Sequence, residues 1–521
     1  MRGAAWLGGI ALAACGGPAP GPSRLVFLDG AVRVDGAGAA GLPGAQAIPG
    51  GAVVARPWAP GERVELAGQR AVAPPEPQCE ALFAVDLGDA RATVAAGNFP
   101  EAALAFSPDG ATLAVGTQDG VLRVLDAWTG ALRASRSLPE AAIKQVAWSA
   151  DGATLYVTEQ SPDATLHALD PASLGPRWSR RLADEVETSA PPAAGDAYGM
   201  WTLPAGYGLS ALPDGGLLVA AAHAWAGADG VTQNRSVVLR LGADGAPRAR
   251  WPAAGAADTV LRHLAVDAAG GRAAVTVNRS AAGPRAADTP PDGVLPFDLA
   301  TLTPGAPVVP DPLPPWFPAP FVWEGLDVAG GRLGIGLGDG RVVLYGADGR
   351  PQASAAPGAP LLAGEVPIHA SVGWGRFVGA DFVVTVSGTL IPWGAASPEL
   401  RPPSPHPEAR TVRAFGPDGA LRWSLPTEAE PQGLTLSPDG AWLAVGLGVA
   451  SGAAAALDGG YGALRMRAGG PAAPVPVRCP TRGPVFFRQA LTADGRLAVV
   501  EAPVLGPGQI VEGAWRVVVL R

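Results

Sequence analysis

The stretch LAFSPDGATLAVGTQDGVLRVLDAWTGALRAS, residues 104–135, decides the fold class of this chain. Apolar and polar residues alternate along its runs, as they do in β-strands that bury one face. Asp109-Gly110 and Asp119-Gly120 separate the first three runs, and Asp-Gly pairs suit the tight turns of β-hairpins. Thr129-Gly130 precedes a last short run. The stretch therefore predicts a small antiparallel sheet of four strands.

Seven further units of this kind follow, at spacings of roughly 42 to 63 residues, which marks a repeat architecture. They begin at Val146, Leu209, Leu264, Gly325, Phe377, Gly433 and Gln489. A four-stranded antiparallel unit repeated at this interval is the content of a β-propeller blade. We therefore expect an all-β chain with a β-propeller of eight blades. If one of the units is only a divergent hairpin, the propeller has seven blades instead. An array of β-sandwiches is the alternative fold.

The same residues carry a family resemblance. The string FSPDG…LAVG…DG within residues 106–130 resembles the exported bacterial propellers of the WD-repeat-like and YVTN-like group. The closing runs at residues 166–178 and 412–423 resemble the repeats of pyrroloquinoline-quinone-type propellers. The resemblance covers residues 80–521 and implies the fold; it implies no particular chemistry, because one fold carries many functions.

The two ends of the repeat region are expected to meet. The last unit offers three strands, at residues 486–491, 497–501 and 515–520, so its fourth strand must come from elsewhere. The strand-like segment 81–95 precedes the first full unit, and we expect it to close the ring by pairing with the C-terminal strand, which removes open edges. Cys79 and Cys479 lie just before these two elements, and we expect a disulfide between them.

The N-terminus has the pattern of an export signal. Arg2 precedes an uncharged apolar run at residues 4–14, which is too short to span a hydrocarbon core of about 30 Å. The run ends in Leu-Ala-Ala-Cys at residues 12–15, which resembles the bacterial lipobox. This resemblance implies that Cys15 carries a lipid and anchors the mature chain to a membrane. Gly16 after that cysteine favours the outer membrane, facing the periplasm or the cell surface; a secretory signal cleaved elsewhere is the alternative.

These features divide the chain into four parts. Residues 1–14 are the signal peptide, and residues 15–24 form a Gly/Pro-rich tether. Short strand candidates at residues 25–76 predict a small β-rich extension, and a Pro-rich run at 74–77 marks its end. Residues 77–521 form the propeller. The net charge of −8 argues against nucleic acid as a partner.

We expect no catalytic residue, metal or cofactor. The five histidines (His167, His223, His263, His369 and His406) lack metal-type spacing. The Asp-Gly turns at Asp109, Asp151, Asp214, Asp439 and Asp494 recur at one position of the unit, which indicates hairpin turns rather than an acidic site. Neither a calcium loop nor the adjacent cysteines of some quinoprotein dehydrogenases is present.

The expected function is that of a lipid-anchored scaffold in the cell envelope that binds a protein or glycan partner without enzymatic activity. Insertions near residues 186–206, 222–236, 279–294 and 392–410 are the expected variable surfaces, since loops carry recognition. Aromatic residues in or beside them are the candidate interaction surface: Trp201, Tyr207, Trp225, Trp316, Trp323 and Trp393. Two alternatives stay open: a hydrolase or lactonase with a site in the central channel, and an envelope-assembly factor resembling the propeller lipoprotein of the outer-membrane β-barrel machinery.

Overall fold

The computed structural model describes most of the chain. The described residues are 24–28, 31–48, 51–57, 59, 61–66, 68–72, 78–88, 103–138, 141–190, 202–227, 230–279, 289–310, 324–355, 361–363, 366–368, 370–388, 406–449, 460–469, 474–506, 509–512 and 514–521. The chain divides into two compact units, Met1–Gln78 and Cys79–Arg521, and each is described by itself. None of the helices in these ranges has the length and apolar character needed to cross a membrane.

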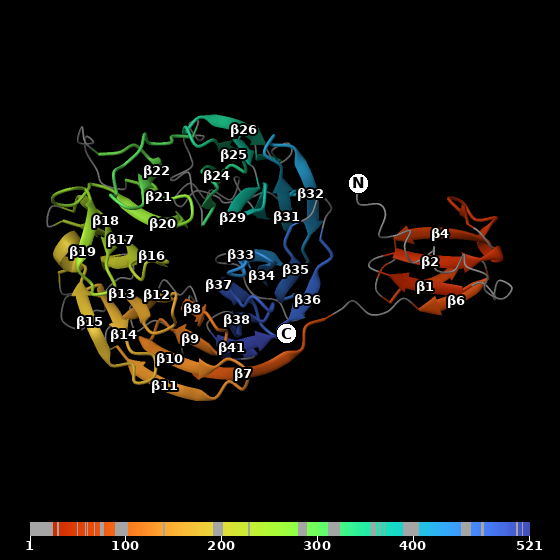
Figure 1. The fold of residues 1–521 in the computed structure, drawn as a ribbon, viewed down its shortest axis with the longest axis horizontal. Helices are drawn as coiled ribbons and strands as arrows, with labels where there is room; N and C mark the ends of the chain where they lie inside the picture. Colours follow the sequence, from red (N-terminus) through yellow and green to blue (C-terminus); the bar gives the residue numbers. More distant parts are fainter. Residues whose placement is uncertain are drawn as a thin grey trace. The chain divides into compact units, whose positions relative to one another are not determined.

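The first unit is a small β-module (Figure 1). Its four-stranded sheet has the order β1 (Arg24–Leu28), β2 (Ala31–Gly36), β4 (Gly51–Pro57) and β3 (Gln46–Ile48), and a hairpin joins β5 (Arg63–Leu66) to β6 (Gln69–Val72). The short helix η1 (Ala37–Ala39) follows β2. Val34, Ala39, Ala52 and Val54 form its core.

The second unit is a ring of antiparallel sheets (Figure 1). In chain order, the first sheets are β8 (Ala103–Phe106), β9 (Thr112–Gly116), β10 (Val121–Asp126) and β11 (Leu132–Ser137); β12 (Ala142–Trp148), β13 (Leu155–Gln160), β14 (Thr165–Leu169) and β15 (Pro176–Arg181); β16 (Ala205–Ala211), β17 (Leu217–Ala226), β18 (Thr232–Leu241) and β19 (Pro247–Trp251); and β20 (Val260–Asp267), β21 (Arg272–Asn278) and β22 (Gly293–Asp298).

The ring continues with four further sheets. These are β23 (Leu326–Ala329), β24 (Arg332–Gly336), β25 (Val342–Tyr345) and β26 (Pro351–Ala355); β29 (Ser371–Val378), β30 (Asp381–Ser387), β31 (Thr411–Phe415) and β32 (Leu421–Pro426); β33 (Glu430–Leu436), β34 (Trp442–Gly448), β35 (Gly462–Arg467) and β36 (Val477–Pro480); and β37 (Val485–Leu491), β38 (Leu497–Glu501), β41 (Trp515–Leu520) and β7 (Ala81–Gly88). Two hairpins, β27 (Leu361–Ala363) with β28 (Val366–Ile368) and β39 (Val504–Gly506) with β40 (Gln509–Glu512), and the short helix α2 (Ala183–Val186) complete the described elements.

The first strand of each sheet faces the centre of the ring (Figure 1). These inner strands contact one another in the order β8, β12, β16, β20, β23, β29, β33 and β37, and β37 contacts β8 again. A closed cycle of antiparallel sheets is a β-propeller, so the predicted fold is confirmed and the sandwich array is excluded. The single residue pair Gln160–Ala205 joins β13 to β16. A count of eight blades requires that the ring be divided at this pair, so the number of blades stays a prediction.

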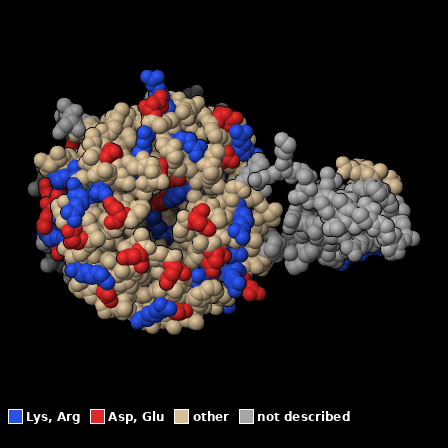
Figure 2. Space-filling model, viewed as in Figure 1, with Lys and Arg blue, Asp and Glu red and all other residues tan. Residues whose placement is uncertain are grey.

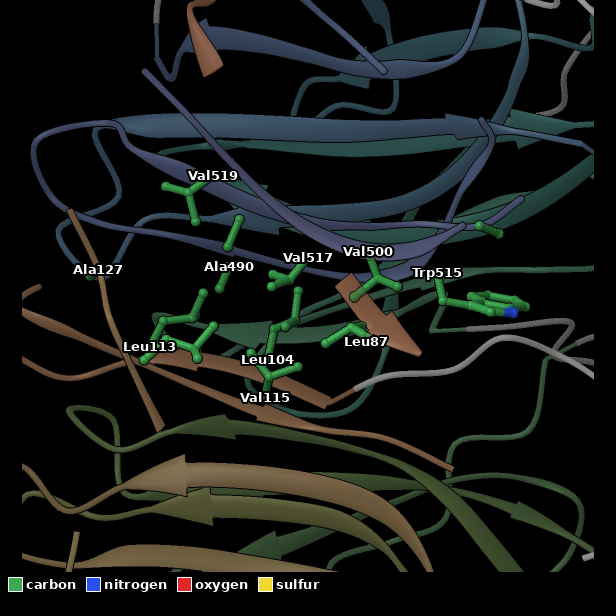
Figure 3. Packing of buried hydrophobic residues seen from close by; sticks show 13 residues of the cluster. Leu87, Leu104, Leu113, Val115, Ala127, Ala490, Val500, Trp515, Val517 and Val519 are labelled. Atoms are coloured by element: carbon green, nitrogen blue, oxygen red, sulfur yellow. The ribbon is translucent and has the colours of Figure 1, made fainter. Parts of the chain in front are cut away.

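The middle strands of the sheets are buried on both faces because neighbouring sheets stack against each other. Strands β9 and β38 have buried residues at nearly every position. Figure 3 shows how Leu113 and Val115 of β9 pack with Val500 of β38, Val517 of β41 and Leu87 of β7. The first and last sheets of the ring therefore share one hydrophobic core.

The N-terminal strand of the ring closes its last sheet, as the strand count predicts. Strand β7 pairs antiparallel with β41, and Val85 faces Val517 across the pair. A disulfide joins Cys79 to Cys479, with their Cα atoms 4.7 Å apart. The Cys79 amide also donates to the Arg478 carbonyl at 2.8 Å. The expected closure by strand pairing and the expected disulfide are both present.

The Asp-Gly pairs of the repeats form hairpin turns. At the first one, Asp109 accepts hydrogen bonds from the Ser107 hydroxyl at 2.6 Å and the Ala111 amide at 2.9 Å. Gly110 has a φ of 68°, a left-handed conformation that glycine adopts without steric cost. Asp151 and Asp439 make the same side-chain contact in their units. The repeated acidic residues thus stabilise turns.

Candidate functional site in the central channel

Bulges interrupt several inner strands of the ring. Register shifts occur in β12, β16, β20, β29, β33 and β37. A bulge inserts a residue into one strand and redirects its side chain, and bulges are common near functional sites. The residues within these shifts include Lys144, Tyr207, Arg262, His263 and Arg488. Residues that carry charge or a polar ring therefore lie on the strands that surround the central channel.

Figure 2 shows a hollow at the centre of the ring, with basic and acidic atoms inside it. We define the channel cluster as His263, the four charged residues that act on it electrostatically, and Lys144; all lie on inner strands or just before one. Its members are Lys144 of β12, Arg262 and His263 of β20, Glu324 two residues before β23, Arg376 of β29 and Arg488 of β37.

Glu324 joins two arginines that come from separate strands. Its Oε2 atom lies 2.8 Å from Nη2 of Arg376, and its Oε1 atom lies 2.8 Å from Nη1 of Arg488. Burial acts to raise the pKa of Glu324, but the charges of Arg488 and Arg376 outweigh it and lower that pKa to about 2. The carboxylate is therefore ionised at neutral pH and is a weak base.

His263 lies in the electrostatic field of these groups. Burial lowers its pKa to about 4; Glu324 acts in the opposite direction, while Arg262, Arg488 and Arg376 add to the lowering. The imidazole is therefore neutral at neutral pH. It can offer one N–H donor to a ligand but no positive charge.

Lys144 and Tyr207 lie together on neighbouring inner strands. The Nζ atom of Lys144 is 5.6 Å from the centre of the Tyr207 ring, within the range of a cation–π contact. The side-chain amide of Gln145 donates to the Tyr207 carbonyl at 2.9 Å, which ties β12 to β16 at this level. The aromatic ring and the chain's single lysine therefore belong to one part of the channel wall.

The charge of the channel cluster is opposite in sign to that of the chain. Lys144, Arg262, Arg376 and Arg488 provide four positive charges and Glu324 one negative charge at neutral pH, whereas the whole chain carries −8. Asp327 of β23 lies nearby; burial raises its pKa, and it accepts a hydrogen bond from the Phe377 amide at 2.7 Å.

The backbone is strained where β37 presents Arg488. Phe487 has a φ of 51°, a left-handed conformation that is unusual for a bulky residue. Gly433 of β33 permits this arrangement, since a Cβ atom there would lie 2.2 Å from the Phe487 carbonyl oxygen. The Phe487 ring lies 6.1 Å from that of Trp374. Strain of this kind gathers at functional sites, where the surrounding structure maintains it.

The predicted aromatic surface is described in part. Tyr207 lies on β16 at the channel, rather than in a loop. Trp225 lies near the end of β17, where its ring stacks on His223 at 4.2 Å and the Arg235 guanidinium lies 5.9 Å from it. Four other predicted members (Trp201, Trp316, Trp323 and Trp393) and the predicted lipidation residue, Cys15, lie outside the described residues.

Three further histidines lie away from the channel cluster. His167 contacts Glu159 and, at 3.1 Å, the Ser179 hydroxyl. His223 is fully buried against the Ser189 hydroxyl and backbone carbonyls, and the buried His406 accepts from the Glu408 amide at 3.1 Å. His369 lies outside the described residues. Within the described ranges, His, Cys, Asp and Glu side chains form no group of three that could hold a metal ion.

Sequence reasoning did not single out the channel cluster. The sequence did contain a signal, because each basic residue of the cluster lies within an otherwise largely apolar inner-strand run. The four runs are AIKQVAW at residues 142–148, VLRHLAV at 260–266, GWGRFVG at 373–379 and VFFRQAL at 485–491.

Comparisons with known proteins agree with the fold. A model of the anaphase-promoting complex subunit 4 WD40 domain matches residues 98–151. This match supports the WD-repeat-like resemblance of the first units. No curated protein matches the chain.

Solved structures of propellers also resemble this chain. The C-terminal WD40 domain of Sif2 shares 12% identity over 85% of this chain and 98% of its own, with a TM-score of 0.48. BamB from Moraxella catarrhalis shares 15% over 71% and 94%, with a TM-score of 0.40. The β-propeller domain of Myceliophteria thermophila Cps50 (Swd1) shares 11% over 85% and 99%, also at 0.40. At such low identities these structures say nothing about a ligand.

Proposed function

We propose that this chain is a lipid-anchored β-propeller of the cell envelope that acts as a non-enzymatic binding scaffold, with its partner bound at the central channel. The lipobox-like residues 12–15 support the anchor and the location. The closed ring supports the scaffold role, because strand pairing and the Cys79–Cys479 disulfide hold the inner strands in a fixed arrangement.

The observation that carries the binding role is the chemistry of the channel cluster. A general acid or base works best with a pKa near the working pH. The pKa of Glu324 is about 2 and that of His263 about 4, both well below neutrality. Arginines do not release their protons at physiological pH. Fixed positive charge on rigid strands suits recognition of a charged partner better than it suits proton transfer.

Capture from envelope extracts tests the binding role. The full-length chain and its Arg376→Gln/Arg488→Gln variant are used as baits for detergent-solubilised membranes of the source cells. Arg133→Gln, at an exposed ion pair on β11, is the matched control. We expect a partner that the wild type and the control retain and the channel variant loses. Retention of the same proteins by all three baits, or hydrolysis of lactone or ester substrates that the channel variant abolishes, would overturn the proposal.

Membrane partitioning tests the anchor. Cys15→Ser should release the exported chain from the membrane fraction and abolish the incorporation of labelled fatty acid. Cys479→Ser is the matched control and should keep both properties, because it leaves the lipobox intact. An unchanged membrane fraction for Cys15→Ser would refute the lipid anchor.

A further inference from the structure

We propose that a groove between the sheets β20–β22 and β23–β26 binds an aromatic side chain of a partner protein. These two sheets are neighbours in the ring (Figure 1). The groove lies outside the channel cluster, so it adds a second contact surface to the scaffold. Three features point to this ligand: the shape of the groove, the aromatic rings that fill the corresponding place between other sheets, and an exposed arginine at the rim.

The groove has the size and lining of a binding site. Its volume is about 460 Å³, within the range of about 300 to 1,000 Å³ that is typical of ligand pockets. Pro296, Val328 and Leu333 contribute apolar walls, and the exposed Arg272 and Asp348 also border it. Apolar walls inside a polar rim are the anatomy of a contact between proteins.

The groove is open because the sheet β20–β22 lacks a regular outer strand. The segment that follows β22 makes only isolated bridges, Val294 with Val308 and Phe297 with Pro304. Pro304 has no amide hydrogen for a strand ladder, and Gly305 has no side chain that could cover the neighbouring sheet. The place that a fourth strand would cover is therefore accessible.

Aromatic rings fill this place between other sheets. Gly130, Gly245 and Gly349 each lie in the turn after the third strand of their sheet. A Cβ atom at Gly130 would lie 2.6 Å from the Phe83 ring of β7, and one at Gly245 would lie 2.7 Å from the Trp178 ring of β15. Both rings come from the outer strand of the preceding sheet. A Cβ atom at Gly349 would meet no described atom within 4 Å apart from its chain neighbours, so here the place of the ring is vacant.

Arg496 shows how an arginine beside such a groove pairs with an aromatic ring. It follows the turn after the inner strand β37 and donates to the Gly110 and Ala127 carbonyls of the next sheet, at 2.9 and 3.4 Å. The Trp128 ring lies 3.8 Å from its guanidinium, within the range of a cation–π contact. This arginine side chain is only 4% exposed.

Arg272 makes the equivalent backbone contacts without a ring. It follows the turn after the inner strand β20 and donates to the Gly331 and Ala347 carbonyls at 3.4 and 3.0 Å, in the corresponding two turns of the next sheet. The next residue in the second turn is Asp348, where the first sheet has a tryptophan. Among the described residues, no aromatic ring lies over Arg272, and this side chain is exposed.

An aromatic side chain complements both the charge and the walls of the groove. The negative face of a ring attracts the positive guanidinium, and arginine makes such contacts more often than lysine. The apolar body of the ring fills the space beside Leu333. A carboxylate would satisfy only the guanidinium, and an aliphatic group would satisfy only the walls. Aromatic side chains are also the anchors that most often dominate the binding energy of protein interfaces.

Fluorine NMR tests the inference on the purified full-length chain. The probe is a pentapeptide amide with 5-fluorotryptophan at its centre and Ser and Gly on either side, and its line broadening reports weak binding. We expect saturable binding that Arg272→Gln weakens about threefold or more, because the cation–π contact is lost. Asp348→Trp should weaken it about tenfold or more, since the new indole fills the groove as Trp128 fills its own site.

Matched variants control for the charge and for the added ring. Arg248→Gln, in an exposed pair, should bind the peptide as the wild type does. Asp244→Trp places an indole at the same position of an identical Gly-Ala-Asp-Gly turn away from the groove and should also leave binding unchanged. Circular dichroism and thermal melting identify any variant that fails to fold. If Arg272→Gln fails, Arg272→Lys, which keeps the charge but loses the planar group, should weaken binding in the same direction.

Other probes separate the possible occupants. The same peptide with 5,5,5-trifluoroleucine at its centre should bind several times more weakly. Equal binding of both peptides, equal binding by the wild type, Arg272→Gln and Asp348→Trp, or no saturable binding by the wild type would overturn the inference. Tighter binding of free 5-fluoroindole would assign the groove to a small molecule. Binding gained only by a Trp316→Ala/Trp323→Ala variant would assign it to the chain's own residues 311–323, and either result would overturn the inference.

The groove and the channel are tested independently. The channel variant Arg376→Gln/Arg488→Gln should bind the fluorinated peptide as the wild type does, because these arginines pair with Glu324 and do not line the groove. Loss of peptide binding in this folded variant would contradict the assignment to the groove. Failure of the peptide experiment leaves the capture experiment on the channel arginines unaffected.

Discussion

Arg488 of β37 and Glu324, which lies two residues before β23, form an ion pair of 2.8 Å, although β23 and β37 are not neighbours in the ring. Strands β29 and β33 lie between β23 and β37 in the cycle of inner strands. Arg376 of β29 binds the other oxygen of the same carboxylate. The channel therefore contains side chains that reach across it, and its charges act as one group.

The disulfide is expected to stabilise the closure of the ring. Replacing both cysteines, by Cys79→Ser and Cys479→Ser together, should lower the free energy of unfolding by about 2 to 5 kcal/mol, because the crosslink restricts a very long loop of the unfolded chain. Urea denaturation, with and without reductant, measures this change. Cys15→Ser should leave the urea midpoint unchanged. Equal midpoints for the wild type and the double variant would contradict a stabilising disulfide.

Arg496 connects the last sheet to the first. This side chain is 4% exposed, donates to the Gly110 carbonyl at 2.9 Å and lies 3.8 Å from the Trp128 ring. Arg496→Met should destabilise the fold by about 2 to 4 kcal/mol, because it leaves buried carbonyls without their donor. Arg133→Met at an exposed pair should change stability by no more than about 0.5 kcal/mol. Thermal unfolding distinguishes the two, and equal small effects would show that Arg496 does not support closure.

The Phe382 ring of β30 packs against two glycines of neighbouring strands. It is fully buried, and Cβ atoms added at Gly334 and Gly375 would each lie 2.4 Å from its ring. Phe382→Ala should cost about 3 to 5 kcal/mol through the cavity that it leaves. Leu421→Ala, at a side chain that is 52% exposed, is the control and should be nearly neutral. A loss below about 1 kcal/mol for Phe382→Ala would mean that the neighbouring sheets collapse into the space.

Acidification should weaken the fold through His263. Its pKa is about 4 in the folded chain against a usual value of 6.5, so the unfolded chain takes up the proton first. This residue's contribution is fully present above pH 6.5 and is lost as the pH falls toward 4, at a cost of at most about 3 kcal/mol. Because the pKa of Glu324 is also lowered in the folded chain, this residue adds a further loss of folding stability as the pH falls from about 4.5 to 2.

Urea titrations at pH 7.5, 5.5 and 4.5 measure this dependence. The free energy of unfolding of the His263→Asn variant should fall less between pH 6.5 and 4.5 than that of the wild type. The comparison isolates His263, because Asp327 and Glu430, whose pKa values burial raises, remain in both proteins and act in the opposite direction. Parallel pH profiles for the two proteins would contradict the prediction.

The fold could be predicted from the sequence because the patterns that specify its strands and turns are local. The alternation around Asp109-Gly110 and the repetition of that unit predict four-stranded sheets, and the missing fourth strand of the last unit predicts pairing with the segment 81–95, of which residues 81–88 form β7. The positions of Cys79 and Cys479 then predict their disulfide. These inferences need only strand patterns and the requirement that a ring leaves no open edge.

The channel cluster was not readable in the same way. The side chain that a bulged strand sends into the channel depends on how neighbouring sheets stack, as at Lys144 and Arg488. Tyr207 was predicted to lie in or beside the insertion at residues 186–206, and it is the third residue of the inner strand β16. The pairing of Glu324 with Arg488 links residues from distant units, and no local pattern encodes it.

Site-specific photocrosslinking tests most directly the central claim that the chain binds its partner at the channel. A photoreactive amino acid replaces Tyr207 at the channel in one protein and Leu132, which is 60% exposed on the outer strand β11, in another. Each full-length protein is irradiated in the presence of detergent-solubilised membranes of the source cells. The account predicts a protein adduct from position 207 that Arg488→Gln suppresses, and none above background from position 132. Equal adducts at both positions, or an adduct at 132 alone, would contradict it.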